Sequence, residues 1–260
     1  MPIVIALFLG AAVGSFLNVC ILRVPKNESV VTPGSHCLSC REKIEWFDNI
    51  PVFSFIFLKG RCRHCLEAIS WQYPLVEVAS AALFVEFYRF FGFSPKGVFY
   101  LILTLSLFVV SFIDFRHRII PDKITLPGVA LGLLASTAFP SLQGDSVWWV
   151  GFLKSVLGIL SGGGILYLVG SVAERLLKKE AMGGGDVKLL AMIGAFTGLP
   201  GVLWTLFTSS VLGSLVGGYL KWKKGEELIP YGPYLAAGCV FYLFFSTSIM
   251  AWYLKVMGAA

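Results

Sequence analysis

Two aspartates lie where apolar stretches of the sequence meet polar ones, and a pair of carboxyl groups can perform acid–base chemistry. Asp186 follows three consecutive glycines at positions 183–185 and begins an apolar run of small residues. The glycines leave room for another backbone to approach the carboxyl group. An ionised group at bilayer depth costs roughly 3 kcal/mol on insertion scales, so its presence there indicates a function. The alternative interpretation is a helix-capping aspartate, since these also precede apolar runs.

The second aspartate, Asp114, lies inside an apolar run, whereas Asp122 follows a proline and is typical of a helix cap. Two carboxyl groups held close together cannot both ionise freely, so one keeps a proton while the other can activate a water molecule. That division of labour defines aspartic proteolysis. Two alternatives remain open from these residues. One is a proton-coupled transport site. The other is an ion pair of Asp114 with Arg116, Arg118 or Lys188.

A second group of chemically capable residues consists of four cysteines in two Cys-x-x-Cys pairs: Cys37 with Cys40, and Cys62 with Cys65. Four thiolates suit tetrahedral Zn²⁺, although the separation between the pairs is slightly longer than that of a usual zinc ribbon. Four protein ligands leave no open position for a catalytic water, so the metal is expected to be structural. Two disulfides are the alternative, disfavoured on a reducing cytoplasmic side. The neighbouring His36 and His64 are further candidate ligands.

The composition indicates what kind of protein positions these residues. Of the 260 residues, 57% are hydrophobic and 14% are charged, and the mean hydropathy is +0.79. A soluble domain could not cover so much apolar surface. We therefore predict an all-α polytopic membrane protein with about eight transmembrane helices. The apolar segments are 2–22, 73–91, 96–113, 124–139, 147–177, 187–199, 201–220 and 234–256. The sixth is short enough to be partly re-entrant.

These segments predict three parts: 1–22 as the first transmembrane helix, 23–72 as a small zinc-ribbon-like cytoplasmic domain, and 73–260 as a core of about seven helices. Seventeen of the 21 lysines and arginines then fall on the inner side, as the positive-inside rule requires. The N-terminus is expected outside and both aspartates at cytoplasmic helix ends. No basic region precedes the first apolar run, so no separable signal peptide is expected.

The small and basic residues support two further predictions. Small residues recur four positions apart at 158/162, 191/195, 194/198, 210/214 and 213/217, a spacing that lets helices approach closely in lipid. The basic residues cluster at the ends of apolar segments and form no continuous stripe, which disfavours nucleic-acid binding.

Several motifs in this order resemble the type IV prepilin peptidase family, which shares the Gly-x-Gly-Asp signature with presenilin-like intramembrane aspartic proteases. The motifs are the two cysteine pairs around 46–51, the stretches 58–63 and 73–77, Asp114 with 120–122, and the stretches 182–190 and 229–235. They span nearly the whole chain. One departure is Ala181, where many members of the family have glycine.

The resemblance implies a bacterial inner-membrane enzyme that removes the basic leader of type IV prepilins or type II secretion pseudopilins. Cleavage would follow a glycine at the cytoplasmic membrane border, with Asp114 and Asp186 in the catalytic positions. Members with the cysteine domain are similar in also methylating the new N-terminal residue, using S-adenosylmethionine. Gly60 and Arg61 match positions tied to that second activity. The expected partners are prepilins and the lipid bilayer, and the oligomeric state stays open.

Two functions from other classes compete with this interpretation. One is a proton-coupled membrane transporter with a zinc-stabilised cytoplasmic domain. The other is a zinc-bearing scaffold for pilus assembly, in which Asp186 would be dispensable. Loss or persistence of cleavage distinguishes both from a peptidase.

Overall fold

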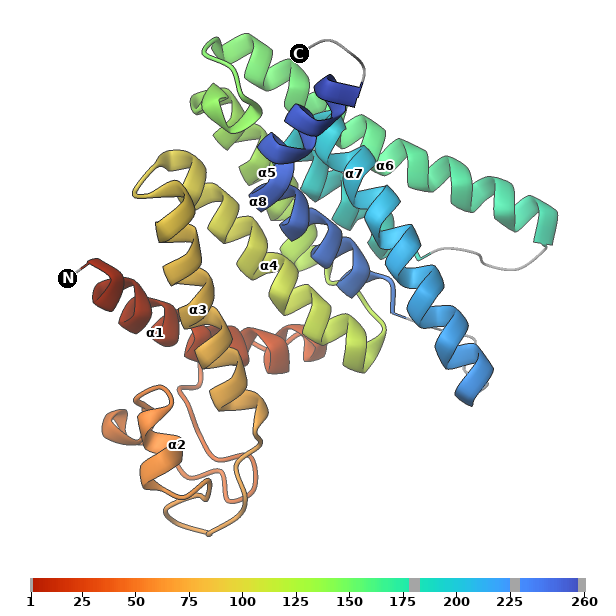
Figure 1. Cartoon of the computed structure of the whole chain (residues 1–260). Coiled ribbons are helices and arrows are strands. Elements are labelled where there is room, and N and C mark those ends of the chain that lie inside the picture. The colour runs from red at the N-terminus through yellow and green to blue at the C-terminus, as the bar shows by residue number, and fades with distance from the viewer. Residues whose placement is uncertain (1, 178–182, 225–229, 257–260) are drawn as a thin grey trace. The chain divides into compact units, whose positions relative to one another are not determined.

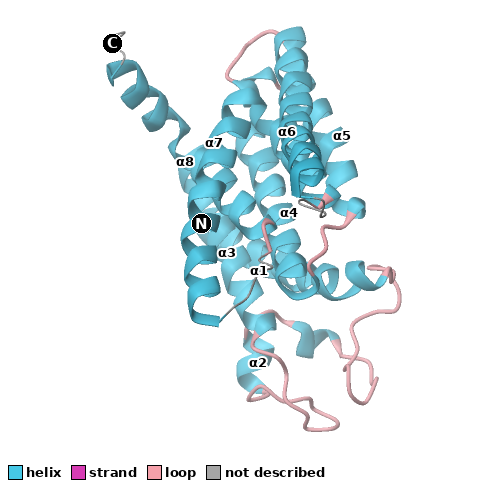
Figure 2. Ribbon diagram, turned by 90° about the vertical axis from the view of Figure 1, so that its right-hand side faces the viewer, coloured by secondary structure: helices cyan, strands magenta, loops and turns pink. Residues whose placement is uncertain are grey.

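The computed structural model describes residues 2–177, 183–224 and 230–256, and within them it contains helices and no strands (Figure 2). The chain divides into two compact units, Met1–Gly97 and Val98–Ala260. The long helices are α1 (Pro2–Arg23), α3 (Gln72–Phe91), α4 (Pro95–His117), α5 (Asp122–Ala138), α6 (Trp148–Leu177), α7 (Gly184–Lys224) and α8 (Gly232–Val256) (Figure 1). The short ones are η1 (Val24–Lys26), η2 (Trp46–Asn49), α2 (Phe53–Phe57) and η3 (Pro140–Gln143). Ala181, Met182 and Ile229 lie outside the described residues.

Several helices have the length and composition of membrane spans. Among the described residues, four are long and apolar enough to cross a bilayer: Pro2–Lys26, Pro95–His117, Trp148–Leu176 and Gly184–Leu220. A shorter apolar helix covers Gly232–Ser246. Because such segments satisfy their own backbone hydrogen bonds, helices are the form expected in lipid. The prediction of a mainly helical, multi-pass membrane protein is confirmed.

In the first unit, α1 packs closely against α3, and residues 24–71 connect the two helices. A Cβ atom added at Gly10 would lie 2.7 Å from the Cα of Ala81, and one at Gly14 would lie 2.7 Å from the Cα of Glu77. Glycine at both positions therefore allows the two backbones to touch. The amide of Asn18 also donates a hydrogen bond of 3.1 Å to the carbonyl of Tyr73.

In the second unit, small residues bring α6 against α7. A Cβ atom added at Gly162 would lie 2.5 Å from the carbonyl oxygen of Leu190, and one at Gly158 would overlap the carbonyl of Gly194. The predicted close packing through 158/162 and 194/198 is therefore confirmed. The prediction for 210/214 is wrong, because Ser210 and Ser214 are exposed.

Helix α7 covers two of the predicted apolar segments, 187–199 and 201–220, and its helical backbone is broken between them. Gly198 has φ 66° and ψ −171°, and Pro200 follows within the helix. Proline lacks an N–H group and disfavours helical backbone in the residue before it, so the helical hydrogen bonds are interrupted here. The carbonyl of Ala195 instead accepts three side-chain hydrogen bonds of 2.8–3.3 Å. The donors are Ser136, Gln143 and Ser155.

Candidate functional site

Asp114 lies in the last turn of α4 and is only 6% exposed. Its Oδ2 atom accepts a hydrogen bond of 2.9 Å from the backbone N–H of Gly232, the first residue of α8. A Cβ atom added at Gly232 would lie 2.8 Å from that oxygen, so only glycine lets the amide approach without displacement. The carboxyl group is thus held by an element 118 positions away in the sequence.

Asp186 lies in the first turn of α7 and is half-buried. It is close enough to Asp114 for the charge of one carboxyl group to act on the other. Its Oδ1 atom is buried and has no hydrogen-bond partner among the described residues, so this oxygen does not cap the helix. A Cβ atom added at Gly185 would lie 2.7 Å from the Cβ of Ile120, which follows α4. The glycine before Asp186 therefore allows the end of α4 to approach the start of α7.

Lys188, one of the candidate ion-pair partners of Asp114, pairs with a different aspartate. Lys188 donates hydrogen bonds of 2.7 and 2.8 Å to the two carboxylate oxygens of Asp122. Among the described residues Asp114 makes no ion pair, although the charge of Arg118 acts on it. The cap predicted at Asp122 is wrong, because Pro121 precedes the helix and Asp122 is its first residue. The buried Asp114 and the half-buried Asp186 therefore have no ion-pair partner among the described residues.

The four predicted cysteines form one cluster in the first unit. Their sulfur atoms lie within 4.8 Å of one another, and all four thiols are free. The two pairs have matching backbone hydrogen bonds: Cys37 N–H donates to Glu42 at 2.9 Å, and Cys62 N–H donates to Glu67 at 2.9 Å. The residue after each pair has φ 61°. Two equivalent turns thus present four sulfur ligands to one point, which suits a tetrahedral metal ion.

The electrostatics of the cluster favour thiolates in its first positions. The backbone N–H of Cys40 is the main cause that lowers the pKa of Cys37 to about 7. The backbone N–H of Cys65 likewise lowers the pKa of Cys62. Metal ions bind the deprotonated thiol, so these amides prepare the cluster for a metal. Neither His36 nor His64 belongs to the cluster within the described residues.

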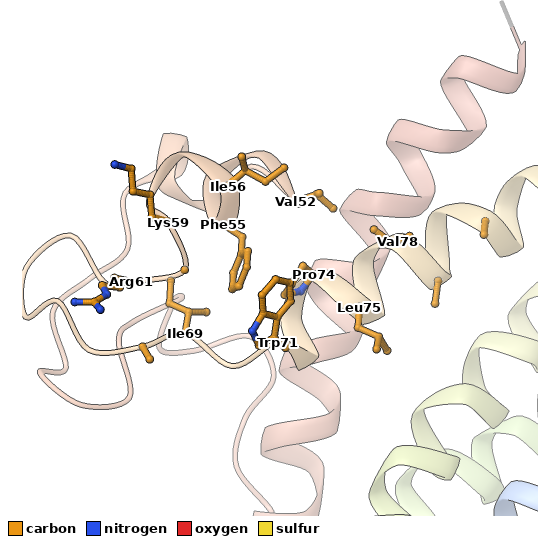
Figure 3. A pocket seen from close by; sticks show the side chains of 14 residues that line it. Val52, Phe55, Ile56, Lys59, Arg61, Ile69, Trp71, Pro74, Leu75 and Val78 are labelled. Atoms are coloured by element: carbon orange, nitrogen blue, oxygen red, sulfur yellow. The ribbon is translucent and has the colours of Figure 1, made fainter.

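Gly60 and Arg61 lie in the same unit, immediately before Cys62. Gly60 has φ 68°, and Arg61 forms an isolated antiparallel bridge with Ala68. Both residues line a groove, in which the rings of Phe55 and Trp71 lie in contact with centroids 4.9 Å apart and their planes tilted by 58° (Figure 3). Gly60 and Arg61 thus belong to the first unit, whereas the two aspartates belong to the second.

The motif at 46–51 is positioned by two contacts that the sequence did not reveal. Arg63 binds the carboxylate of Asp48 through two hydrogen bonds of 2.5 and 2.6 Å, and this pairing lowers the pKa of Asp48. The buried Glu77 accepts a 2.7 Å hydrogen bond from the backbone of Val52. By sequence, Asp48 and Asn49 before Pro51 suit an ordinary turn, and no spacing links Asp48 to Arg63.

Comparison with known proteins gives matches along most of the chain. Residues 8–91 match the family model "Bacterial Peptidase A24 N-terminal domain", and residues 101–218 match "Type IV leader peptidase family". A protein of Xanthomonas campestris is 35% identical over 96% of this chain and 93% of its own length. One of Pseudomonas aeruginosa is 35% identical over 97% and 93%. Both are named prepilin leader peptidase/N-methyltransferase. No solved structure matches the chain.

Proposed function

The chain belongs to the type IV leader peptidase family, and we propose that it is an intramembrane aspartic endopeptidase that removes the leader of type IV prepilins or pseudopilins. Asp114 and Asp186 are its catalytic pair. The observation that supports this assignment is that Asp114, buried at the end of α4, acts electrostatically on Asp186, half-buried at the start of α7, and that neither makes an ion pair in the described part of the chain. The proton-coupled transporter has no comparable support, since the relatives are named as peptidases.

We infer different roles for the two carboxyl groups from their surroundings. The N–H of Gly232 donates to Asp114 and favours its ionised form. Oδ1 of Asp186 is buried with no partner among the described residues, and we assign the shared proton to this carboxyl group. Asp114 takes a proton from a water molecule as the water oxygen attacks the scissile carbonyl carbon, and Asp186 protonates the carbonyl oxygen. When the C–N bond breaks, Asp114 passes its proton to the leaving nitrogen, and Asp186 recovers its own from the hydroxyl group.

Membrane topology explains why cleavage occurs at the border of the bilayer. The chain has eight spans, with α7 supplying two segments around its break, and the N-terminus lies outside the bacterial inner membrane. The division into 1–22, 23–72 and 73–260 follows, with the cysteine domain in the cytoplasm. A leader rich in Lys and Arg remains in the cytoplasm by the positive-inside rule, while the apolar part of the substrate stays in lipid. The scissile bond after glycine is then held at the depth of the two aspartates.

The first unit supports the second activity. The relatives' names include N-methyltransferase, and this chain methylates the new N-terminal residue with S-adenosylmethionine as donor. Gly60 and Arg61 belong to the region responsible. Cys37, Cys40, Cys62 and Cys65 would hold a structural Zn²⁺, which would fix the fold of a domain that lacks a large apolar core. The free, clustered sulfur atoms fit that metal.

Cleavage of a purified prepilin, followed on a gel and by mass spectrometry of the product's N-terminus, tests both activities together. Asp114→Asn and Asp186→Asn should each abolish leader loss, because one carboxyl group cannot divide acid and base roles. Asp122→Asn is the matched control, because its carboxylate pairs with Lys188 at an exposed site. Cleavage by either of the first two variants, or its loss in the control alone, would overturn the assignment. Pilus assembly that survives Asp186→Asn would favour the scaffold.

A further inference from the structure

The groove that Gly60 and Arg61 line has a long apolar body that neither proposed activity explains. It lies between α2 and the beginning of α3 and has a volume of about 950 Å³ (Figure 3). Its walls are mainly apolar, and the paired rings of Phe55 and Trp71 stand at its centre. Leu75 and Val78 extend it along α3. Volumes of this size are typical of sites that bury a small molecule.

The apolar walls are open to the surroundings. Trp71 is 75% exposed and Leu75 is 56% exposed. Trp71 directly precedes α3, a helix that we assign to the membrane, and tryptophan is enriched where spans leave the hydrocarbon. With α3 in the membrane, as the proposed function places it, the groove is continuous with a lipid-facing surface.

Positive charge gathers at one end of the groove. Lys59 and Arg61 lie on the opposite side of the aromatic pair from Leu75 and Val78 (Figure 3). In the described part of the chain, neither cationic side chain makes a hydrogen bond or an ion pair. None of the fourteen described residues that line the groove is acidic. The groove thus combines an apolar body with a cationic end.

We propose that this groove binds an anionic phospholipid, with its phosphate between Lys59 and Arg61 and an acyl chain against Phe55, Trp71 and Leu75. Cationic side chains near the cytoplasmic leaflet attract acidic headgroups, and their stems can cover apolar surface. The positive charge of Lys59 and Arg61 disfavours two other ligands, the substrate's leader and the methyl donor. The basic leader of the proposed substrate would meet two like charges. S-adenosylmethionine carries a sulfonium and an ammonium group, for which the described lining has no carboxylate, and only its single carboxylate would complement Lys59 and Arg61.

Lipid retention by the purified full chain tests this site without substrate or methyl donor. Native mass spectrometry would compare bound phosphatidylglycerol with phosphatidylcholine, added at equal concentrations. The wild type should retain phosphatidylglycerol preferentially. Lys59→Gln should weaken the binding of phosphatidylglycerol about fivefold, the loss expected when one cation near an anionic headgroup is removed. Lys43→Gln is the matched control, since Lys43 is an exposed lysine of the same unit outside the groove.

A second variant tests the apolar body. Ala82 lines the far end of the groove and is exposed, so Ala82→Trp should fill the groove and reduce retention of both lipids. Inorganic phosphate should not displace the bound lipid. Equal retention of the two lipids by the wild type would overturn the proposal, as would equal effects of Lys59→Gln and Lys43→Gln. A rise in the KM for S-adenosylmethionine in Lys59→Gln, with lipid selectivity unchanged, would assign the groove to the methyl donor instead. Because lipid retention involves no cleavage, its failure leaves the peptidase assignment intact.

Discussion

At the scale of single residues, the aspartate site depends on a backbone amide as much as on the two carboxyl groups. Gly232 begins α8, and its N–H is the only described hydrogen-bond donor to the carboxylate of Asp114. Hydrogen bonds to a charged acceptor contribute about 1.5–3 kcal/mol. An amide in this position can favour the ionised aspartate without adding a second mobile charge.

Gly232→Ala should therefore reduce cleavage by about 10- to 100-fold, the factor that corresponds to losing one such charge-assisted bond. The added Cβ atom would lie 2.8 Å from Oδ2 and would displace the carboxylate. Gly164→Ala is the matched control, because nothing lies within 4 Å of a Cβ atom at that helical position. Single-turnover cleavage rates provide the measurement, and methylation of pre-cleaved pilin reports whether the protein is folded. Equal rates for the two variants would contradict the role of Gly232.

The sequence indicated both aspartates but not this amide. Asp114 and Asp186 are conspicuous because charge is rare in apolar runs. Gly232 donates its N–H to Asp114 across 118 positions of the sequence. Because glycine has no side chain, its residue type does not indicate this hydrogen bond. The ion pair between Asp122 and Lys188 was missed for a related reason, since Asp122 fits a cap equally well by spacing.

At the scale of helices, hydropathy located the helices well and their ends less well. The segment predicted at 73–91 differs by one residue from α3, which covers Gln72–Phe91. Helix α4, in contrast, continues to His117, past the predicted end at 113. Asp114 lies in the last turn of this helix. The helix continues beyond the apolar run from which it was predicted, so hydropathy alone placed its end too early. The hydropathy pattern therefore identified the helices. The polar helix ends that form the aspartate site depend on tertiary contacts, which the pattern does not show.

The break in α7 makes a prediction at this scale. Gly198 has φ 66° and ψ −171°, a conformation essentially confined to glycine that costs other residues about 1–3 kcal/mol. An added Cβ atom would also lie 2.7 Å from the side-chain oxygen of Gln143. Gly198→Ala should lower the Tm of the reconstituted protein by several degrees, while Gly218→Ala, on the same helix with open space around it, should not. Thermal unfolding followed by circular dichroism measures both, and equal Tm values would show that the break tolerates a side chain.

At the scale of the whole molecule, the two kinds of chemistry belong to different units. The cysteine cluster and the groove lie within Met1–Gly97, and the aspartates lie within Val98–Ala260. The two family models follow the same division. Residues 8–91 match the first model and lie within the first unit, and residues 101–218 match the second model and lie within the second unit. A defect confined to the metal cluster should therefore affect the two activities unequally.

Cys37→Ser provides that test. Removing one of four thiolates should release the metal, because a three-sulfur site lacks the closed tetrahedron of a structural zinc site. Methylation should fall at least tenfold, since metal binding and folding are linked in such domains, whereas leader cleavage should change by less than threefold. Cys20→Ser is the matched control, because Cys20 lies in α1 outside the cluster. Metal content by inductively coupled plasma mass spectrometry is read on the same samples. Unchanged zinc in Cys37→Ser would refute the site, and an equal loss of both activities would show that the peptidase unit requires the metal as well.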